Sequence, residues 1–292
     1  MPRNRDLPSS QPSRHERASS VKNRANYPGQ HLLRSRRIIR RMIELARICP
    51  QPLVLDIGAG LGALTVPLAD EGWRVLAVEN DSRLAGRLRG RMAAKENVRV
   101  VEQDVLRTPL PHSPFSVVAN IPFAITTGIL GRLMDCPASA FQRGVLLIQH
   151  EAARRFMRSP ITDIRLLVWR MWFRWELVEV VPPRHFAPPP NVNAALLTVS
   201  RRREALLPAQ EYWRFLGLAQ SALSAPEMPL GQALRDVFTP TQLRLVFRTT
   251  DLQRETPVCR MTEQQWAIVY HTMHRHVPPA RWPRASRPRW FR

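Results

Sequence analysis

The sequence predicts an α/β fold with a largely parallel seven-stranded sheet, followed by a small C-terminal α-helical domain. Between residues 52 and 149, short and continuously apolar segments alternate with segments whose apolar residues recur at helical spacing. This alternation is typical of a parallel sheet covered by helices on both faces. Beyond residue 203 only the helical spacing continues. A chain of 292 residues is long enough for one large domain and a smaller one.

The elements of the larger domain can be assigned in order. Ser35 is the expected N-cap of a first helix that ends near Cys49 and Pro50. The apolar face of this helix would consist of Ile38, Ile39, Met42, Leu45 and Ala46. We expect strands at 52–58, 73–79, 98–104, 115–121 and 143–149, and helices at 64–72 and 83–94. A closing hairpin is expected from 176–181 and 194–202, around the proline-rich loop 182–193.

The smaller domain is expected to be helical. One helical face is formed by Tyr212, Phe215, Leu216, Ala219 and Leu223. Thr262 and Gln265 have the spacing of a capping box, which would begin a last helix through Val269. We therefore divide the chain into a basic N-terminal arm at 1–28, an α/β domain at 29–203, a helical domain at 204–272, and a tail rich in Arg, Pro and Trp at 273–292.

The charge of the chain is concentrated at its two ends. The whole sequence has 44 Lys and Arg against 23 Asp and Glu, a formal charge of +21. Residues 1–48 carry twelve basic and three acidic side chains, and residues 273–292 carry six arginines and no acid. Basic ends on a nearly balanced body indicate binding to a polyanion such as nucleic acid. Nearly all these cations are arginines, which suit phosphate contacts and base stacking, although genome composition alone could give the same bias.

Several classes of protein are disfavoured. No stretch reaches the length and apolarity of a bilayer-spanning helix, and the polar N-terminus does not resemble a secretory signal, so we expect a cytoplasmic protein. Cys49, Cys136 and Cys259 are widely spaced and form no CxxC pair. We therefore expect neither a disulfide framework nor a bound metal.

A glycine-rich loop follows the first strand of the predicted sheet. In "DIGAGLG", Gly58, Gly60 and Gly62 would let the backbone turn sharply and approach a ligand closely. The second strand ends at Glu79, 21 residues after Gly58, where a carboxylate can accept the hydroxyls of a ribose. A tight strand-to-helix turn would explain the glycines alone, but not their combination with the acid.

The spacing of this loop discriminates between nucleotide cofactors. A nicotinamide dinucleotide would favour GxGxxG, whereas this loop reads GxGxG with Asp56 two residues before it. That arrangement suits a zwitterionic amino-acid end without a phosphate. The third strand ends at Asp104, whose carboxylate can receive the amino group of an adenine.

The fourth strand ends in "NIPF", which is Asn120-Ile121-Pro122-Phe123. An amide, a proline and an aromatic ring at the end of a buried strand form a small polar mouth with a stacking surface. A planar, nitrogen-bearing group is the expected occupant.

These motifs carry a resemblance to a known family. Together "DIGAGLG", "VLAVEND", "VVEQDVL" and "VVANIPF" resemble the rRNA adenine N6-methyltransferases. The chain looks most like the erythromycin-resistance (Erm-type) enzymes of 23S rRNA and less like the 16S rRNA dimethyladenosine transferases. The resemblance runs from Gly29 to about Arg203, includes "PPRHFAPPPNVNAALL", and continues more weakly into the helical domain.

The resemblance implies a Rossmann-like class I methyltransferase fold that uses S-adenosylmethionine, with 29–203 as the catalytic domain and 204–272 as an RNA-binding domain. It also implies a monomer that acts on ribosomal RNA, and resistance to macrolide, lincosamide and streptogramin B antibiotics as the biological outcome. The cofactor-binding residues implied are Gln30, His31, Leu33, Gly58, Gly60, Glu79, Asp104 and Asn120.

The implied catalytic residues are Asn120, Ile121, Pro122 and Phe123. The amide of Asn120 and the carbonyl of Ile121 would each accept one N–H of the target amine, and Phe123 would stack on the base. Two departures stand out. The family's Gln-Asn-Phe reads Gln30-His31-Leu32 here, so His31 is either a ligand of the cofactor or a structural hydrogen bonder. The aromatic residue after Ile-Pro is often tyrosine and here is Phe123.

Three other functions compete with this interpretation. A 16S rRNA dimethyltransferase is disfavoured by "NIPF" in place of "NLPY" and by the arginine-rich ends. A non-catalytic RNA-binding factor on the same fold is disfavoured because the expected site residues are all present. An oxidoreductase is disfavoured by the spacing of the glycine loop. For the tail from 273, the arginines could follow phosphates while Trp282 and Trp290 stack on bases, or the tryptophans could dock on the helical domain.

Overall fold

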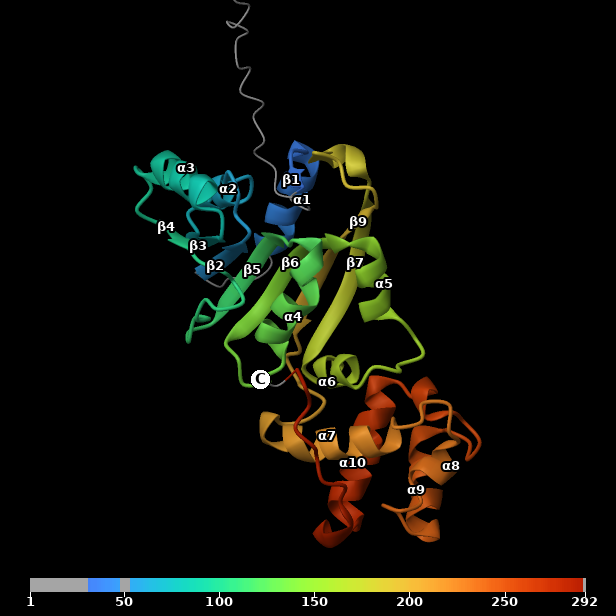
Figure 1. Ribbon diagram of the computed structural model, residues 1–292. Helices are drawn as coiled ribbons and strands as arrows, with labels where there is room; N and C mark the ends of the chain where they lie inside the picture. The colour runs from blue at the N-terminus through green and yellow to red at the C-terminus, as the bar shows by residue number, and fades with distance from the viewer. Residues whose placement is uncertain (1–30, 48–52, 291–292) are drawn as a thin grey trace, which may run out of the picture.

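The computed structural model describes residues 31–47 and 53–290, which form a sheet domain and a helical domain (Figure 1). The main sheet contains seven strands in the order β4-β3-β2-β5-β6-β9-β7. Their bounds are β2 Leu53–Ile57, β3 Arg74–Glu79, β4 Val98–Glu102, β5 Phe115–Asn120, β6 Phe141–Gln149, β7 Phe173–Val181 and β9 Ala194–Arg201. The seven predicted strands are therefore present, with ends that differ by up to three residues.

The first five strands of this sheet, β2 to β6, are parallel, and β9 inserts antiparallel between β6 and β7. The predicted closing hairpin is β7 and β9, which pair antiparallel. All parallel strands therefore place their carboxyl ends at one edge, where loops from different parts of the chain meet.

Helices cover both faces of the sheet. Along β2, Val54 packs with α1 on one side, whereas the next residue, Leu55, belongs to the core on the opposite side. The first face carries α1 (Arg36–Arg47), α2 (Thr65–Asp70) and α3 (Ser82–Met92), and the second carries α4 (Thr126–Met134), α5 (His150–Met157) and α6 (Ile164–Trp172). The sequence did not separate α6 from the following strand, because this helix is buried nearly all round and lacks a single apolar stripe.

A second, very small sheet supports the edge where the strands end. It pairs β1 (Leu32–Leu33) antiparallel with β8 (Phe186–Ala187). The segment before the first helix is thereby joined to the proline-rich loop, more than 150 residues later in the chain.

The smaller domain contains α7 (Tyr212–Ala222), α8 (Leu230–Ala233), α9 (Pro240–Thr250) and α10 (Glu263–His276). Thr262 and Gln265 form the expected capping box at the start of α10. A second box, from Thr239 and Gln242, begins α9. Because α10 is regular as far as His276, helix extends four residues beyond the expected domain end at 272. Short 3-10 turns occur at Phe123–Ile125, Pro183–His185, Ala209–Glu211, Val258–Arg260 and Pro279–Arg281.

The chain after α10 folds back onto the helical domain. The indole N–H of Trp282 donates to the Val277 carbonyl at 2.8 Å, and both Trp282 and Trp290 pack partly buried against the core. Of the two alternatives considered for these tryptophans, docking on the protein is what the structure contains. The segment runs upward past α7 toward α6 in Figure 1.

Some sequence predictions fall outside the described residues, namely the arm at 1–28, Gln30, Cys49, Pro50 and the end of the first helix. Of the described cysteines, Cys136 is exposed and Cys259 is buried, and both are free thiols. Among the described residues, no helix combines the length and apolarity that crossing a bilayer requires.

One half-buried ion pair joins α4 to α6 and yields a stability prediction. Asp135 accepts hydrogen bonds from Arg165 at 2.6 and 2.9 Å and from the indole of Trp169 at 2.9 Å. We expect Asp135→Ala to lower the free energy of unfolding by about 2 kcal/mol or more, because it leaves a half-buried guanidinium unpaired. Glu179→Ala is the control, since its pair with the exposed Arg37 should contribute less than about 1 kcal/mol. Equal losses for the two variants in urea denaturation would contradict this.

Candidate active site

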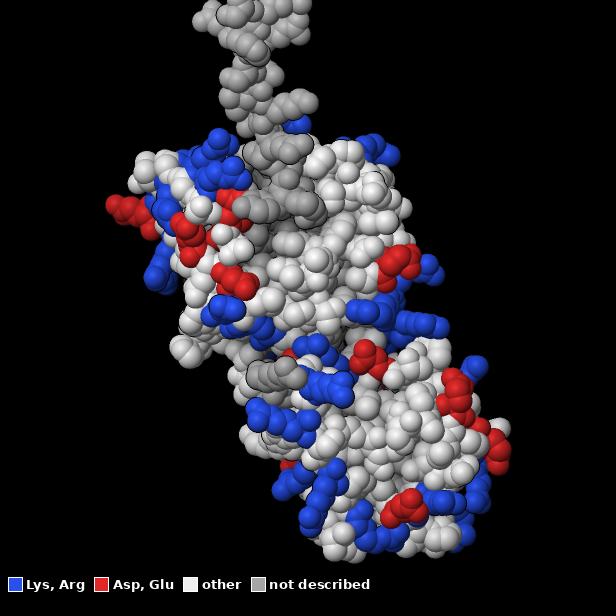
Figure 2. Space-filling view, in the orientation of Figure 1, with Lys and Arg blue, Asp and Glu red and all other residues white. Residues whose placement is uncertain are grey.

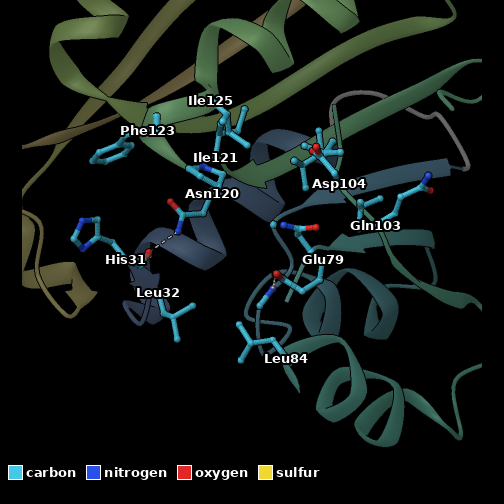
Figure 3. A pocket seen from close by; sticks show the side chains of 18 residues that line it. His31, Leu32, Glu79, Leu84, Gln103, Asp104, Asn120, Ile121, Phe123 and Ile125 are labelled. Carbon is cyan, nitrogen blue, oxygen red and sulfur yellow. Dashed lines mark hydrogen bonds between the residues drawn. The ribbon is translucent and has the colours of Figure 1, made fainter. Parts of the chain in front are cut away.

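A hollow of about 420 Å³ lies at the carboxyl ends of β2, β3 and β5 and just beyond the end of β4 (Figure 3). Both polar and apolar side chains line it. Of the residues predicted from the sequence, it brings together His31, Gly58, Gly60, Glu79, Asp104, Asn120, Ile121, Pro122 and Phe123. Predicted residues from five separate segments therefore meet at one site, where the parallel strands end.

The glycine loop forms a wall of bare backbone. Gly58 and Gly60 have φ angles of +70° and +55°, which L residues with a side chain rarely adopt. A Cβ on Gly60 would lie 3.2 Å from the Leu32 side chain, and one on Gly58 would lie 3.5 Å from the Pro122 ring. Glycine is therefore required at both positions by the backbone angles, and at Gly60 also by the close approach of Leu32.

Glu79 is buried at the end of β3, with 4% of its surface exposed. Its Oε2 accepts the Gly60 N–H at 2.8 Å and its Oε1 accepts the Asp81 N–H at 2.9 Å. Each carboxylate oxygen has a second lone pair, and the side chain lines the hollow. Glu79 thus fixes the glycine loop, a contact that the sequence did not indicate, and its carboxylate lines the hollow.

Asp104 lies on the same side of the hollow as Glu79, across from His31 and Phe123 (Figure 3). One Asp104 oxygen accepts the Leu106 N–H at 2.8 Å, which orients the half-buried carboxylate. Leu84, Val105 and Ile125 add apolar walls beside it. Sequence reasoning missed these three, although Val105 directly follows Asp104. An apolar slot with one oriented carboxylate suits a flat ring that carries an amino group.

Asn120 is tied to the segment before α1. Its Nδ2 donates to the His31 carbonyl at 2.8 Å. Because a carbonyl can only accept, this bond fixes the NH₂ of the amide toward His31 and leaves Oδ1 on the other side. His31 is itself anchored, since Nδ1 donates to the Pro188 carbonyl at 2.9 Å and the ring lies 6.0 Å from that of Phe123. His31 is therefore a structural hydrogen bonder that also lines the hollow.

Leu33, which was predicted to contact the cofactor, lies outside this hollow with only 4% of its surface exposed. Its strand neighbour Leu32 lines the hollow instead, because successive strand residues point to opposite sides. Leu33 lines an adjoining hollow of about 560 Å³, together with Asp56, Gly58, Asn120 and Pro188.

Asp56 is the most perturbed carboxyl of this region. It is 1% exposed and accepts a hydrogen bond from the Thr65 hydroxyl at 2.6 Å. Burial raises its pKa from 3.8 to about 7, and the nearby charge of Glu79 acts in the same direction, while the Thr65 bonds oppose the shift. A cationic group placed in the adjoining hollow would favour the ionised form.

The two hollows fit a nucleoside joined to a zwitterionic amino acid. Acceptors for ribose hydroxyls and for an exocyclic amine lie in the first hollow, and the buried acid lies in the second. No cluster of three metal-ligating side chains occurs among the residues that the structure describes.

The shifted pKa of Asp56 predicts a pH dependence of stability. The folded state holds this proton more tightly than the unfolded chain, so its stabilising contribution is complete below the ordinary pKa of 3.8 and is lost as pH rises toward about 7. We expect Asp56→Asn to flatten the fall in unfolding free energy across this range, where one such group contributes a slope of up to about 1.4 kcal/mol per pH unit. Parallel urea-denaturation profiles for the two proteins, without cofactor, would contradict this.

Comparison with known proteins places this chain in a family. Residues 21–274 match the ribosomal RNA adenine dimethylase family. An rRNA adenine N-6-methyltransferase of Bacillus licheniformis is 40% identical over 262 residues, covering 90% of this chain and 91% of that protein. The ribosomal RNA small subunit methyltransferase A of Thermosynechococcus vestitus is 39% identical over 224 residues, covering 74% of this chain and 84% of that protein.

Solved structures agree with the sequence relatives. The crystal structure of the 23S rRNA methyltransferase ErmE superposes with a TM-score of 0.74 at 27% identity, covering 84% of this chain and all of that one. A dimethyladenosine transferase from Plasmodium falciparum has the same fold, with a TM-score of 0.66 at 22% identity. The match over most of the length, together with the methyltransferase sheet and the residues gathered at its edge, shows that the chain belongs to the ribosomal RNA adenine dimethylase family and is an rRNA adenine N6-methyltransferase.

Proposed function

We propose that this enzyme transfers the methyl group of S-adenosylmethionine to N6 of an adenine in 23S rRNA. The observation that carries the proposal is the orientation of Asn120. Its NH₂ group is committed to the His31 carbonyl, so its Oδ1 is the atom available to accept a hydrogen bond from a target amine. An amide held in this way selects a donor such as the exocyclic amine of adenine.

The chemical task of the site is to make this amine nucleophilic. Its lone pair is delocalised into the purine ring, so acceptors on both N–H bonds are needed to direct the lone pair toward an incoming methyl group. Asn120 Oδ1 accepts one of them. The carbonyl of Ile121, which precedes a proline without an N–H, accepts the other, and the N–H of Ile121 is held by the Leu147 carbonyl at 2.9 Å.

We assign cofactor contacts to the same two hollows. S-adenosylmethionine, when bound, supplies an electrophilic methyl group on a sulfonium. Glu79 accepts from the ribose, Asp104 accepts from the adenine amino group, and Gly58 and Gly60 give close approach. Asp56 and the adjoining hollow receive the methionine end, and Gln30 stays a predicted ligand outside the described residues.

Two considerations favour 23S rRNA over 16S rRNA as the substrate. ErmE, a 23S rRNA methyltransferase, superposes on 84% of this chain, and the motif is "NIPF" rather than "NLPY". The small-subunit methyltransferase of T. vestitus, at 39% identity, keeps 16S rRNA as the second candidate. If the substrate is 23S rRNA, we propose resistance to macrolide, lincosamide and streptogramin B antibiotics as the outcome.

We further propose that the enzyme is a cytoplasmic monomer. In this proposal residues 29–203 carry catalysis and residues 204–272 contribute to RNA binding, with the basic ends 1–28 and 273–292 outside both. The two basic ends supply charge for the RNA, because residues 1–28 carry six basic and two acidic side chains and residues 273–292 carry six arginines and no acid.

The test is methyl transfer to purified RNA. The protein is incubated with labelled S-adenosylmethionine and either 23S or 16S rRNA freed of protein, and modified adenines are mapped by primer extension and mass spectrometry. We expect label at an adenine of 23S rRNA. Label only in 16S rRNA would overturn the 23S proposal, and a protein that fails to bind the cofactor in calorimetry would revive a non-catalytic RNA-binding factor.

Replacement of Asn120 tests its proposed contact with the target amine. We expect Asn120→Ala to lower kcat by about 10²- to 10³-fold, the usual effect of removing one positioned hydrogen-bonding group, with a much smaller change in cofactor affinity. Phe123→Tyr is the control, since stacking needs no hydroxyl and activity should survive. Turnover at the wild-type rate in Asn120→Ala would exclude this amide from the site.

Replacement of Glu79 tests its contact with the ribose. We expect Glu79→Gln to raise the cofactor dissociation constant by about tenfold or more, because a hydrogen bond to a charged group contributes about 1.5 to 3 kcal/mol. The matched control is Glu102→Gln, which stands opposite Glu79 in the β3–β4 register but is exposed and paired with Arg89. If calorimetry gives the same affinity for both variants, Glu79 serves only to hold the loop.

A further inference from the structure

Residues 278–290, here called the C-terminal strap, have a three-residue period in both sequence and exposure. The sequence from 281 to 289 reads Arg-Trp-Pro, Arg-Ala-Ser, Arg-Pro-Arg. The exposed arginines of this period are Arg281, Arg284 and Arg287. The residue after each of them, Trp282, Ala285 and Pro288, is half-buried or buried. One side of the strap therefore faces the protein and another carries arginines.

Polyproline II geometry explains this period. It has three residues per turn and rises about 3.1 Å per residue, so side chains three apart lie on one side at intervals of about 9 Å. Trp282, with φ −72° and ψ 132°, has nearly these angles, and Pro283 and Pro288 favour them. Residues 283–288 belong to no helix or strand. The strap is thus an extended segment whose arginines form a regular row.

The strap is fixed to α7. Gln220 donates from Nε2 to the Ser286 carbonyl at 2.9 Å and accepts the Ser286 N–H at 2.8 Å through Oε1. One turn earlier, Gly217 has no room for a Cβ, which would collide with the carbonyl oxygen of Pro283. These contacts fix the distance of the strap from α7 and its position along the helix.

The far end of the strap reaches the catalytic domain. The guanidinium of Arg165 on α6 lies 5.7 Å from the ring centroid of Trp290. Arg165 is itself held by Asp135 at the end of α4. The position of the arginine row is therefore fixed relative to the sheet domain that carries the active site, in contrast to a freely hanging arm.

The exposed side of the strap fits a phosphate backbone. Residues 278–290 contain four arginines and no acidic residue. Figure 2 shows Lys and Arg side chains on the part of the helical domain where Figure 1 draws this segment. Arg281 donates to the Asp236 carbonyl at 3.2 Å, which orients a guanidinium that has further donors. Trp213, on the same helix as Gly217 and Gln220, is 44% exposed and offers a stacking surface. Arginines combined with an exposed aromatic ring favour RNA as the partner.

We propose that the C-terminal strap is a preformed RNA-binding surface whose arginines contact phosphates of the rRNA substrate while the docked side holds them at a fixed place beside the active-site domain. The inference rests on the proposed function for the identity of the RNA. It assigns the apolar residues of the tail to docking and its arginines to the RNA.

The first experiment compares two triple variants of equal charge. Arg284, Arg287 and Arg289 are replaced together by Gln, and the control replaces the exposed Arg74, Arg87 and Arg99 near the β4 edge, the opposite edge of the sheet from β7. Affinity for transcribed 23S rRNA is measured from 50 to 300 mM KCl, roughly the range in which phosphate contacts change affinity strongly. We expect the strap variant to flatten the slope of log affinity against log salt by about 2, at about 0.7 per lost contact, and to weaken binding about tenfold or more. Equal losses in the two variants would overturn the proposal, because they would reflect net charge alone.

The second experiment tests the docking. Gly217→Ala retains every arginine and should favour the helix itself by about 1 kcal/mol, but its Cβ must displace the strap. We expect weaker RNA binding and faster tryptic cleavage after Arg284, with cofactor affinity unchanged. Wild-type RNA affinity in a variant whose strap is cleaved faster would show that docking is irrelevant and would overturn the proposal.

The two proposals fail separately. At saturating RNA the strap variant should still methylate 23S rRNA with a normal kcat and a raised KM. If wild-type protein methylates no 23S rRNA, the proposed function fails, while the salt slopes measured on 23S and 16S rRNA still decide whether the strap binds RNA.

Discussion

The hydrogen bond from the Asn120 amide to the His31 carbonyl joins segments 89 residues apart, and the geometry of the whole site depends on it. It requires β5 to end at Asn120 and the segment before α1 to lie across that end. The segment is held there by pairing of β1 with β8 and by the bond from His31 to Pro188. These contacts join three segments: the proline-rich loop, the segment before α1 and strand β5. Together the three segments fix the orientation of the Asn120 amide.

Negative and positive charges occupy different parts of the molecule. The chain carries a formal charge of +21, yet three carboxylates, those of Asp56, Glu79 and Asp104, line the two hollows. Arginines dominate the ends of the chain and the strap. A cofactor with a sulfonium and an ammonium is cationic, whereas RNA is anionic, so the two ligands require opposite local fields. The carboxylates line the hollows, whereas the arginines of the strap are exposed on the surface, so each ligand meets charge of the opposite sign.

The sheet and the polar strand ends could be read from the sequence because they depend on local patterns. Apolar runs located the first five strands of the chain's sheet, and the proline-rich loop marked the closing hairpin. The glycines with Glu79 and Asp104 marked the edge of the sheet where the hollow lies. Contacts between residues far apart in the chain could not be predicted from the sequence. Nothing local indicates that Glu79 already accepts the Gly60 and Asp81 amides, or that Leu32 and not Leu33 faces the first hollow. Both follow from where the β1–β8 pair and the glycine loop meet, which only the folded chain determines.

The buried core passes without interruption from the sheet, through α6, into the helices of the smaller domain, where Phe215 and Trp266 belong to the same cluster as Leu55 and Val117. Two regions that share one apolar interior cannot expose it separately without a large loss of burial. We therefore expect the sheet domain and the helical domain to unfold together, with amides on both sides of α6 exchanging with deuterium through one common opening. A chain without the helical part would leave the sheet domain with an open apolar flank.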